Sequence, residues 1–300
     1  MFRKILVPLD GSPLAEQALE PALRLAQAAV GELILMRVLT DADSHAHVKT
    51  AQDPIRFPES SALVHHASNA YLQRLREASI RPRLSVRTIL GEGDRAGAII
   101  DTALAEQVDL IVMSTHGRTG LSRWVFGSVT SRVLSHAPCP ILIIHKVSPI
   151  KHILITLDGS LLAEQALEPG LALAKVFGSK VTLLRVMTGP EVQSSKTTSP
   201  DGSESLANPG NEEMPAIQAE RYLGDLIAIQ ETDSVIMSAR VIFGQIASSI
   251  LDYAAAQEVD LIAMTTHGRT GLRRWVYGSV TEKILYGTRK VVLVIRPLET

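Results

Sequence analysis

Short apolar runs alternate with longer amphipathic segments through the first half of the chain. The runs are nearly continuous in apolar residues, which is typical of strands buried on both faces of a parallel sheet. We expect strands at 5–9, 33–39, 84–90, 110–114 and 141–145, and helices at 14–29, 61–79, 94–107 and 128–136. This alternation predicts a doubly wound, Rossmann-like α/β domain with a five-stranded parallel sheet, right-handed crossovers and helices on both faces.

The same pattern occurs twice. KILVPLDGSPLAEQALEPAL begins at Lys4 and HILITLDGSLLAEQALEPGL begins at His152, while VDLIVMSTHGRTGL begins at Val108 and VDLIAMTTHGRTGL at Val259. A repeat of about 150 residues indicates duplication of a whole domain rather than a solenoid. We therefore expect two tandem domains, at 1–147 and 148–300. The two halves are least regular at 40–60 and 188–211, and the latter stretch, rich in Ser, Thr, Gly and Pro, is expected to be disordered or mobile.

Composition restricts the function classes. Aliphatic residues carry the hydrophobicity of a chain that is 46% apolar and only 4% aromatic, and the net charge is −1. Without a basic field, nucleic acid is not an expected partner. The first residues contain no signal-peptide core, and no apolar stretch approaches about 18 residues. We expect a soluble, cytoplasmic protein without a membrane partner, in which the single cysteine, Cys139, is a packing residue.

An aspartate follows the first predicted strand of each half, in Asp10-Gly11-Ser12 and in Asp158-Gly159-Ser160. Ligands of open parallel sheets bind outside the carboxyl ends of the strands, where such a carboxylate can accept hydrogen bonds from a ribose hydroxyl or a base amino group. An Asp-Gly-Ser sequence is also an ordinary turn and helix start. Both interpretations stay open at this point.

A glycine-rich loop follows the fourth predicted strand of each half. Ser114-Thr115-His116-Gly117 is followed, after nine residues, by Gly127-Ser128, and Thr265-Thr266-His267-Gly268 by Gly278-Ser279. Glycines let main-chain N–H groups approach a phosphate, and a helix N-terminus adds further donors. The alternative is a tight loop whose serine caps a helix. Because no Walker lysine and no GxGxxG motif are present, we do not expect a P-loop enzyme or a flavin or nicotinamide site.

Charged residues of these loops offer binding rather than catalysis. Arg118 and Arg269 can reach phosphate oxygens. His116 and His267 have no neighbouring nucleophile or metal-ligand spacing, so packing or a loop hydrogen bond is expected of them. We identify no catalytic residue and no metal-ligand set, and binding is better supported than turnover.

These motifs together resemble the universal stress protein family, in its tandem two-domain type. The family signature is Gly-x-x-Gly, nine residues, and Gly-Ser or Gly-Thr, with an Asp after the first strand and a closing strand like APCPILII. The resemblance implies an adenine nucleotide α-hydrolase-like fold that binds ATP, or ADP or AMP, with Mg²⁺ possible at the phosphates. One departure is that Ser114 and Thr265 stand where the family has its first glycine.

The resemblance also implies specific contacts. Asp10 and Asp158 would meet the adenosine, with main-chain contacts to the base from Pro8 and Val38 in the first half and from Thr156 and Val186 in the second. The phosphates would be held by Gly117, Gly127, Ser128 and Val129 in the first half, and by Gly268, Gly278, Ser279 and Val280 in the second. A further departure, Ile242-Phe243-Gly244 in place of Gly91-Glu92-Gly93, is expected to crowd the second site.

Three functions remain open. The leading hypothesis is an ATP-binding stress-response or signalling module whose nucleotide state changes its conformation or its contacts with a protein partner. The others are a slow ATPase and a dimerisation scaffold that binds no nucleotide. The resemblance further implies that strands 141–145 and 291–295 pair within the chain, and it leaves a homodimer possible.

Overall fold

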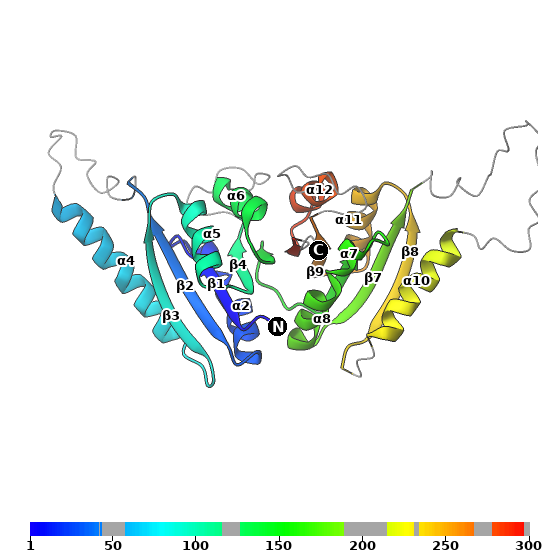
Figure 1. Ribbon diagram of the computed structural model, residues 1–300, viewed down its shortest axis with the longest axis horizontal. Helices are drawn as coiled ribbons and strands as arrows, with labels where there is room; N and C mark the ends of the chain where they lie inside the picture. Colours follow the sequence, from blue (N-terminus) through cyan, green and yellow to red (C-terminus); the bar gives the residue numbers. More distant parts are fainter. Residues whose placement is uncertain are drawn as a thin grey trace, which may run out of the picture. The chain divides into compact units, whose positions relative to one another are not determined.

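The computed structural model describes residues 1–41, 43, 58–115, 127–188, 215–230, 234–266 and 278–296. Contacts between these residues divide the chain into two compact units. The first unit comprises Met1–Val147 together with Val291–Arg296, and the second begins at Ser148. Each unit consists of a sheet with helices packed against its faces (Figure 1).

The first unit has a strand order that reverses direction beside β1. Its elements are β1 (Lys4–Pro8), α1 (Pro13–Glu16), α2 (Leu19–Ala28), β2 (Glu32–Leu39), α4 (Pro58–Ala78), β3 (Ser85–Glu92), α5 (Arg95–Ala105), β4 (Leu110–Ser114), α6 (Ser128–His136), β5 (Ile141–Ile144) and β10 (Val291–Ile295). The strands lie in the order β3-β2-β1-β4-β5-β10, and β1 to β5 pair in parallel. The chain runs from β1 out to β3 and returns past β1 to β4. This reversal creates a switch point between β1 and β4.

The second unit repeats this arrangement. Its elements are β6 (His152–Thr156), α7 (Leu161–Glu164), α8 (Leu167–Phe177), β7 (Lys180–Met187), α10 (Pro215–Ile229), β8 (Met237–Phe243), α11 (Ile246–Ala256), β9 (Leu261–Thr265) and α12 (Ser279–Gly287). The strands β9, β6, β7 and β8 are neighbours in this order and pair in parallel. The alternation of apolar runs and amphipathic segments thus predicted the parallel α/β arrangement of both units.

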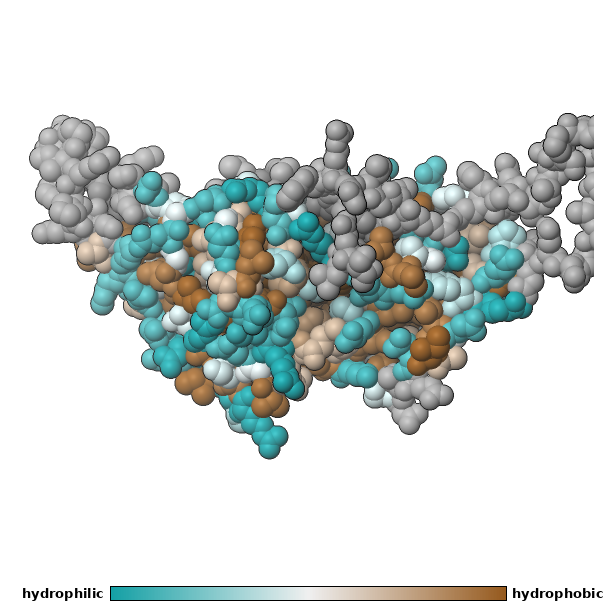
Figure 2. Space-filling model, viewed as in Figure 1, coloured by the Kyte–Doolittle hydropathy of each residue, from teal (hydrophilic) through white to brown (hydrophobic). Residues whose placement is uncertain are grey.

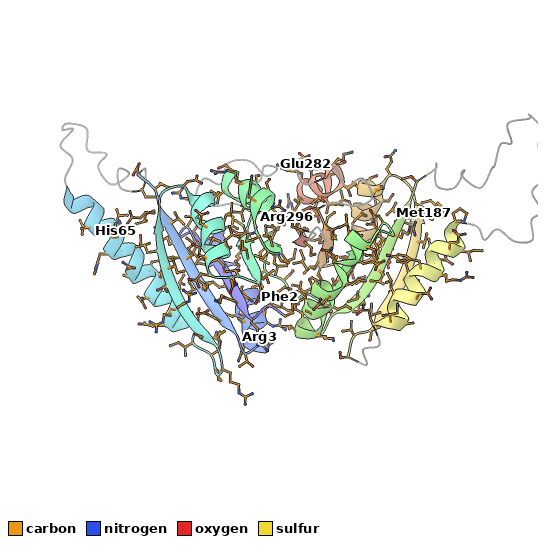
Figure 3. All side chains as sticks on the ribbon, in the orientation of Figure 1. Phe2, Arg3, His65, Met187, Glu282 and Arg296 are labelled. Carbon is orange, nitrogen blue, oxygen red and sulfur yellow. The ribbon has the colours of Figure 1, made fainter. Side chains whose placement is uncertain are left out.

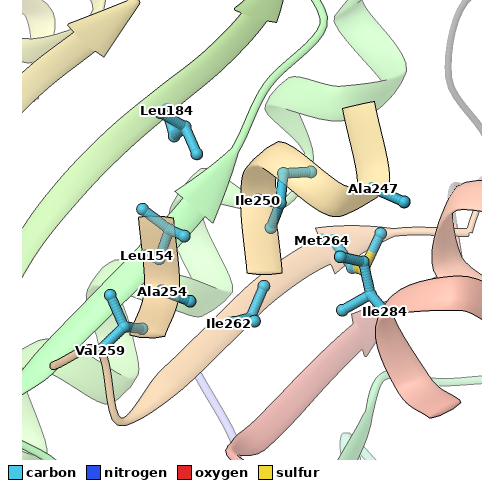
Figure 4. Packing of buried hydrophobic residues seen from close by; sticks show 9 residues of the cluster. All are labelled: Leu154, Leu184, Ala247, Ile250, Ala254, Val259, Ile262, Met264 and Ile284. Carbon is cyan, nitrogen blue, oxygen red and sulfur yellow. The ribbon is translucent and has the colours of Figure 1, made fainter. Parts of the chain in front are cut away.

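The apolar runs are buried because helices cover both faces of each sheet. Leu33, Ile34 and Leu35 of β2 follow one another and therefore point to alternate faces, yet each is 0% exposed. Side chains lie, for example, between β3 and α4 (Figure 3). In the second unit, the core between the sheet and α11 and α12 is aliphatic (Figure 4), and it includes Leu154, Ile250 and Ile284.

The helix predicted at 14–29 forms as two helices, α1 and α2. Proline has no N–H, so Pro21 cannot donate to the carbonyl of Gln17 and the α-helical pattern fails there. The chain bridges the gap with shorter-range bonds, in which the N–H of Gln17 donates to the Leu14 oxygen (3.2 Å) and that of Ala18 to the Ala15 oxygen (3.1 Å). The second half, with Pro169, is interrupted in the same way between α7 and α8.

Strand β10 comes from the end of the sequence but belongs to the first unit. It pairs antiparallel with β5, with Leu293 opposite Leu142 and Val292 opposite Ile143. Val292, Leu293 and Leu142 are 0% exposed. The pairing covers the side of β5 that β4 leaves open, and a strand edge of this kind is otherwise a template for association.

The surface is largely hydrophilic and the single cysteine is buried, as the composition led us to expect. Hydrophilic side chains cover much of the face of each unit seen in Figure 2. None of the helices in the described ranges is long and apolar enough to cross a membrane. Cys139 is buried, and burial raises the pKa of its thiol to about 12, which keeps it protonated and unreactive at neutral pH.

Candidate functional site

A cavity of about 240 Å³ lies at the carboxyl edge of the sheet in the first unit, beside the switch point. Its walls come from the ends of β1, β2 and β4 and from the first turns of α5 and α6. The predicted first-half site residues that the structure describes all line it: Pro8, Asp10, Val38, Ser114, Gly127, Ser128 and Val129. Residues from the two ends of the first half therefore meet at one place.

The central parts of both glycine-rich loops lie outside the described residues. The predicted site residues among them are His116, Gly117 and Arg118 in the first half and His267, Gly268 and Arg269 in the second. The roles expected of these residues stay predictions. The described part of the first site ends at Thr115 and resumes at Gly127.

Asp10 stands in the turn that leads from β1 into α1. The N–H of Ser12 donates to Asp10 Oδ1 (2.9 Å), and the N–H of Ala15 donates to Ser12 Oγ (3.1 Å), which caps α1. Gly11 has φ 87°, a left-handed conformation that glycine adopts without strain. The turn and helix start that the sequence offered as an alternative interpretation are therefore present. Asp10 also lines the cavity, so the two interpretations are compatible. Its bond to the turn fixes the direction in which the carboxylate is held.

Helix α6 begins at the cavity wall with Gly127 as its N-cap, and no described side chain caps it. Its first N–H groups have no partner within the helix, and the helix dipole favours an anion there. The exposed Ser128 adds a hydroxyl at the same end. Thr130 fixes the helix to β4, because its hydroxyl donates to the carbonyl oxygens of Ser114 (3.3 Å) and Thr115 (3.4 Å).

Apolar side chains that the sequence did not single out complete the cavity. Met36, Ile99 and Met113 line it together with Val38. Gly91 makes room for one of them, because a Cβ at this position would lie 3.0 Å from Met36 Cε. An apolar wall with a few polar groups is typical of a small-molecule site. These residues were missed because an apolar residue near a strand end has the same sequence signal as a core residue.

Arg95, the first residue of α5, also lines the cavity and was not predicted. Its Nη2 donates to Asp43 Oδ2 (2.6 Å), which also accepts from the N–H (3.0 Å) and the hydroxyl (2.8 Å) of Thr40. Burial of Asp43 favours its neutral form, but the bonds from Thr40 and Arg95 outweigh burial and lower the pKa of this carboxyl. The carboxylate therefore stays charged and holds the guanidinium in place.

The residue before Arg95 ties two helices of the site together. Asp94 caps α5 by accepting from the N–H of Gly97 (2.7 Å), and Arg132 of α6 donates to its other oxygen (2.7 Å). These bonds from Gly97 and Arg132 lower the pKa of Asp94. Helices α5 and α6, which both border the cavity, are thus linked by an exposed ion pair.

The second half repeats the local geometry of the first. Ser160 N–H donates to Asp158 Oδ1 (2.9 Å) and Ala163 N–H to Ser160 Oγ (3.2 Å), as in the first turn. The hydroxyl of Thr281 donates to the carbonyl oxygen of Thr265 (3.3 Å). The other predicted residues lie at the end of β6 (Thr156), within β7 (Val186), and at the N-cap and first turn of α12 (Gly278, Ser279 and Val280).

Two substitutions distinguish the second half. Ile242 stands at the position of Gly91, and Ile246 at the position of Arg95. Ile242 packs with Val186 and Val280 against the aliphatic cluster shown in Figure 4. Side chains therefore occupy space here that Gly91 leaves open in the first half.

The arrangement at the first cavity favours binding of an anion that carries an apolar group. The N-terminus of α6 suits the anion, the apolar wall suits the apolar group, and the anchored carboxylate of Asp10 can accept hydrogen bonds from the same ligand. Among the described residues, no three His, Cys, Asp or Glu side chains come together in a group that could hold a metal ion.

Two tandem α/β units with parallel sheets, each with a turn-anchored aspartate and a glycine-capped helix at the carboxyl edge, define a duplicated Rossmann-like protein. The universal stress protein family matches residues 1–145 and again residues 149–296. The chain therefore belongs to the universal stress protein family. The family and fold class predicted from the sequence are confirmed.

Individual relatives agree. Over 146 residues the chain is 30% identical to the universal stress protein MJ0531 of Methanocaldococcus jannaschii, an alignment that covers 49% of this chain and 84% of the relative. A putative universal stress protein structure from Pseudomonas aeruginosa matches 99% of this chain and 94% of its own, with a TM-score of 0.67 and 21% identity. The universal stress protein structure from Archaeoglobus fulgidus matches 98% of this chain and 96% of its own, with a TM-score of 0.66 and 18% identity. The two structures share the fold along nearly the whole chain.

Proposed function

We propose that this protein binds ATP, or the related ADP or AMP, and acts in stress response or signalling through nucleotide-dependent conformation or partner contacts. The observation that carries the proposal is the first cavity. The first-half residues selected for nucleotide binding from separate sequence motifs line this one cavity at the switch point of the sheet, wherever the structure describes them. Membership of the universal stress protein family supports the stress-related role.

Each part of the cavity has a proposed role in holding the nucleotide. The carboxylate of Asp10 accepts hydrogen bonds from the ribose, and the main chain at Pro8 and Val38 contacts the base. The N-terminus of α6, from Gly127 to Val129, donates to the phosphates, for which its N–H groups and dipole are suited. The apolar side chains of Met36 and Met113 border the same space and suit the faces of the base.

Magnesium enters this proposal only with the nucleotide. The described residues contain no three-residue cluster of potential ligands, so the phosphates would supply the principal ligands of Mg²⁺. The described cavity residues offer a helix N-terminus, a turn-anchored carboxylate and an apolar wall, which suit the holding of a ligand. Binding, with at most slow hydrolysis, is therefore the activity that we propose.

We further propose domain limits of 1–147 and 148–300, a cytoplasmic location and an intramolecular pseudo-dimer. The antiparallel pairing of β10 with β5 supports the last of these, because it joins the closing strands of the two sequence repeats. A homodimer and a signalling protein partner complete the proposal. Size-exclusion chromatography with light scattering, with and without ATP, tests the homodimer.

The direct test is to denature freshly purified protein and identify the released nucleotide by chromatography, and then to titrate ATP and Mg²⁺ by calorimetry. We expect an adenine nucleotide to co-purify or to bind. Asp10→Ala should weaken binding by at least about tenfold, since a charged hydrogen-bonding group is lost. Absence of released nucleotide and of binding would favour the empty scaffold, and phosphate release that survives Asp10→Ala and Gly127→Val would be contaminating activity.

A further inference from the structure

Arg95 is the one cationic side chain among the described residues that line the first cavity. It opens helix α5, while Ser128 and Val129 open helix α6 on another part of the cavity wall. A positive charge and a helix N-terminus thus border the same cavity. Both favour a negatively charged ligand group.

The ion pair with Asp43 leaves much of the guanidinium available. Every hydrogen bond that Arg95 makes with described residues comes from Nη2, to Asp43 at 2.6 Å and to Thr40 Oγ1 at 3.5 Å. A guanidinium carries five N–H donors, and those of Nε and Nη1 are not used in these bonds. The Arg95 side chain is 39% exposed and that of Asp43 only 13% exposed. A well-packed carboxylate therefore positions a cation that a ligand can still reach.

The second half has no arginine at the position that corresponds to Arg95. Ile246 stands at the first position of α11, where the first half has Arg95, and Gln245 replaces the capping Asp94. The helix forms nevertheless and packs Ala247 and Ile250 into the core. An isoleucine is therefore compatible with the fold at this position, and the arginine is not required for it.

We propose that Arg95 binds the phosphate groups of the nucleotide, with Asp43 as its positioning residue, and that the second half lacks this contact because Ile246 stands at the matching position. This inference rests on the proposed adenine-nucleotide function. It adds a recognition residue outside the glycine-rich loop, and it gives the first half a phosphate contact that the second half lacks at the matching position.

The test compares ATP, AMP and adenosine in calorimetric titrations of the full chain and of Arg95→Ile, the residue that the second half carries. The variant should bind ATP at least about tenfold more weakly, because a charge-assisted hydrogen bond is lost, whereas its affinity for adenosine should change less than about twofold. Arg95→Lys keeps the charge but not the fork, so its affinity for ATP should fall between the two.

The matched control is Arg74→Gln, which removes another positive charge of the first unit that does not line the cavity. It should leave the affinity for ATP within about twofold, so that a direct contact is distinguished from a long-range field. Circular dichroism and thermal melting of each variant establish that it is folded. If Arg95→Ile fails to fold, the ratio of ATP to adenosine affinity in Arg95→Lys decides the question.

The outcomes separate this inference from the proposed function. If the unmodified chain binds ATP and Arg95→Ile binds it equally well, or if ATP and adenosine affinities fall together, Arg95 is not a phosphate ligand although the proposed function stands. If the unmodified chain binds no adenine nucleotide, the proposed function fails. A selective loss for ATP with an unaffected Arg74→Gln control supports the inference.

Discussion

Substitution of Thr182 by valine removes one hydroxyl from a buried polar chain in the second unit. His152 Nδ1 lies 3.0 Å from the carbonyl oxygen of Gln257, so Nδ1 carries the proton and donates. His152 Nε2 then accepts from the hydroxyl of Thr182 (2.8 Å), which in turn accepts from Ser238 (3.1 Å). His152 and Thr182 are each 4% exposed, so water does not readily replace a missing partner.

The expected loss follows from the group left behind. Valine has nearly the shape of threonine, so packing is preserved and the main effect is an unsatisfied nitrogen on His152. Leaving a buried acceptor without a donor costs about 1–3 kcal/mol of unfolding free energy. Ser238 is less buried than Thr182 and can turn to solvent, so it should add little.

Urea unfolding followed by circular dichroism at pH 8 measures this loss. Thr88→Val on β3 is the matched control, because Thr88 accepts only an exposed bond from Gln73 (3.3 Å) and should change stability by less than about 0.5 kcal/mol. A Thr182→Val protein within about 0.5 kcal/mol of the unmodified chain would refute the reasoning. The double variant Thr182→Val/His152→Leu should lose less unfolding free energy than the sum of the two single variants, because both substitutions remove the same hydrogen bond.

The remaining predictions concern pH, a close backbone approach and helix caps. Burial, the largest cause, lowers the pKa of His152 in the folded chain. As the pH falls below about 6.5, the unfolded chain therefore binds this proton more readily than the folded chain, and the unfolding free energy should be lower at pH 5.5 than at pH 8; equal values would contradict this. Gly31→Ala puts a Cβ 2.0 Å from the Arg3 carbonyl oxygen and should lower Tm by at least about 5 °C by calorimetry. Ser12→Ala and Ser160→Ala each remove an N-cap and should cost about 1 kcal/mol in urea unfolding, and no loss in either would argue against the caps.

The fold was predictable because burial on both faces produces nearly continuous apolar strands, a signal that lies in the local sequence. The edge of the site was predictable for a related reason, since the topology alone determines where the ends of β1 and β4 meet. The break between α1 and α2 was not predicted. The helical spacing of apolar residues continues across it, and the prediction of one helix disregarded the missing N–H of Pro21.

Arg95 was missed for a different reason. Its partner Asp43 comes from the segment after β2, and only the folded sheet brings the two together. In the sequence, Arg95 is one charged residue near the start of a helix, where solvation is the common fate of an arginine. The repeat gave no signal for Arg95 either. A repeat marks residues that both halves share, and the second half has Ile246 at this position.

The pairing of β5 with β10 has a consequence for synthesis on the ribosome. The neighbour of β5 lies about 150 residues further along the chain. At about 5–20 residues per second, translation of that distance takes about 8–30 s. Throughout this interval the nascent first unit carries an open strand, whose Ile141–Ile144 is apolar at every position. The first half of the chain is therefore the part that is most exposed to mispairing with neighbouring nascent chains, and a translational pause in the second half prolongs that exposure.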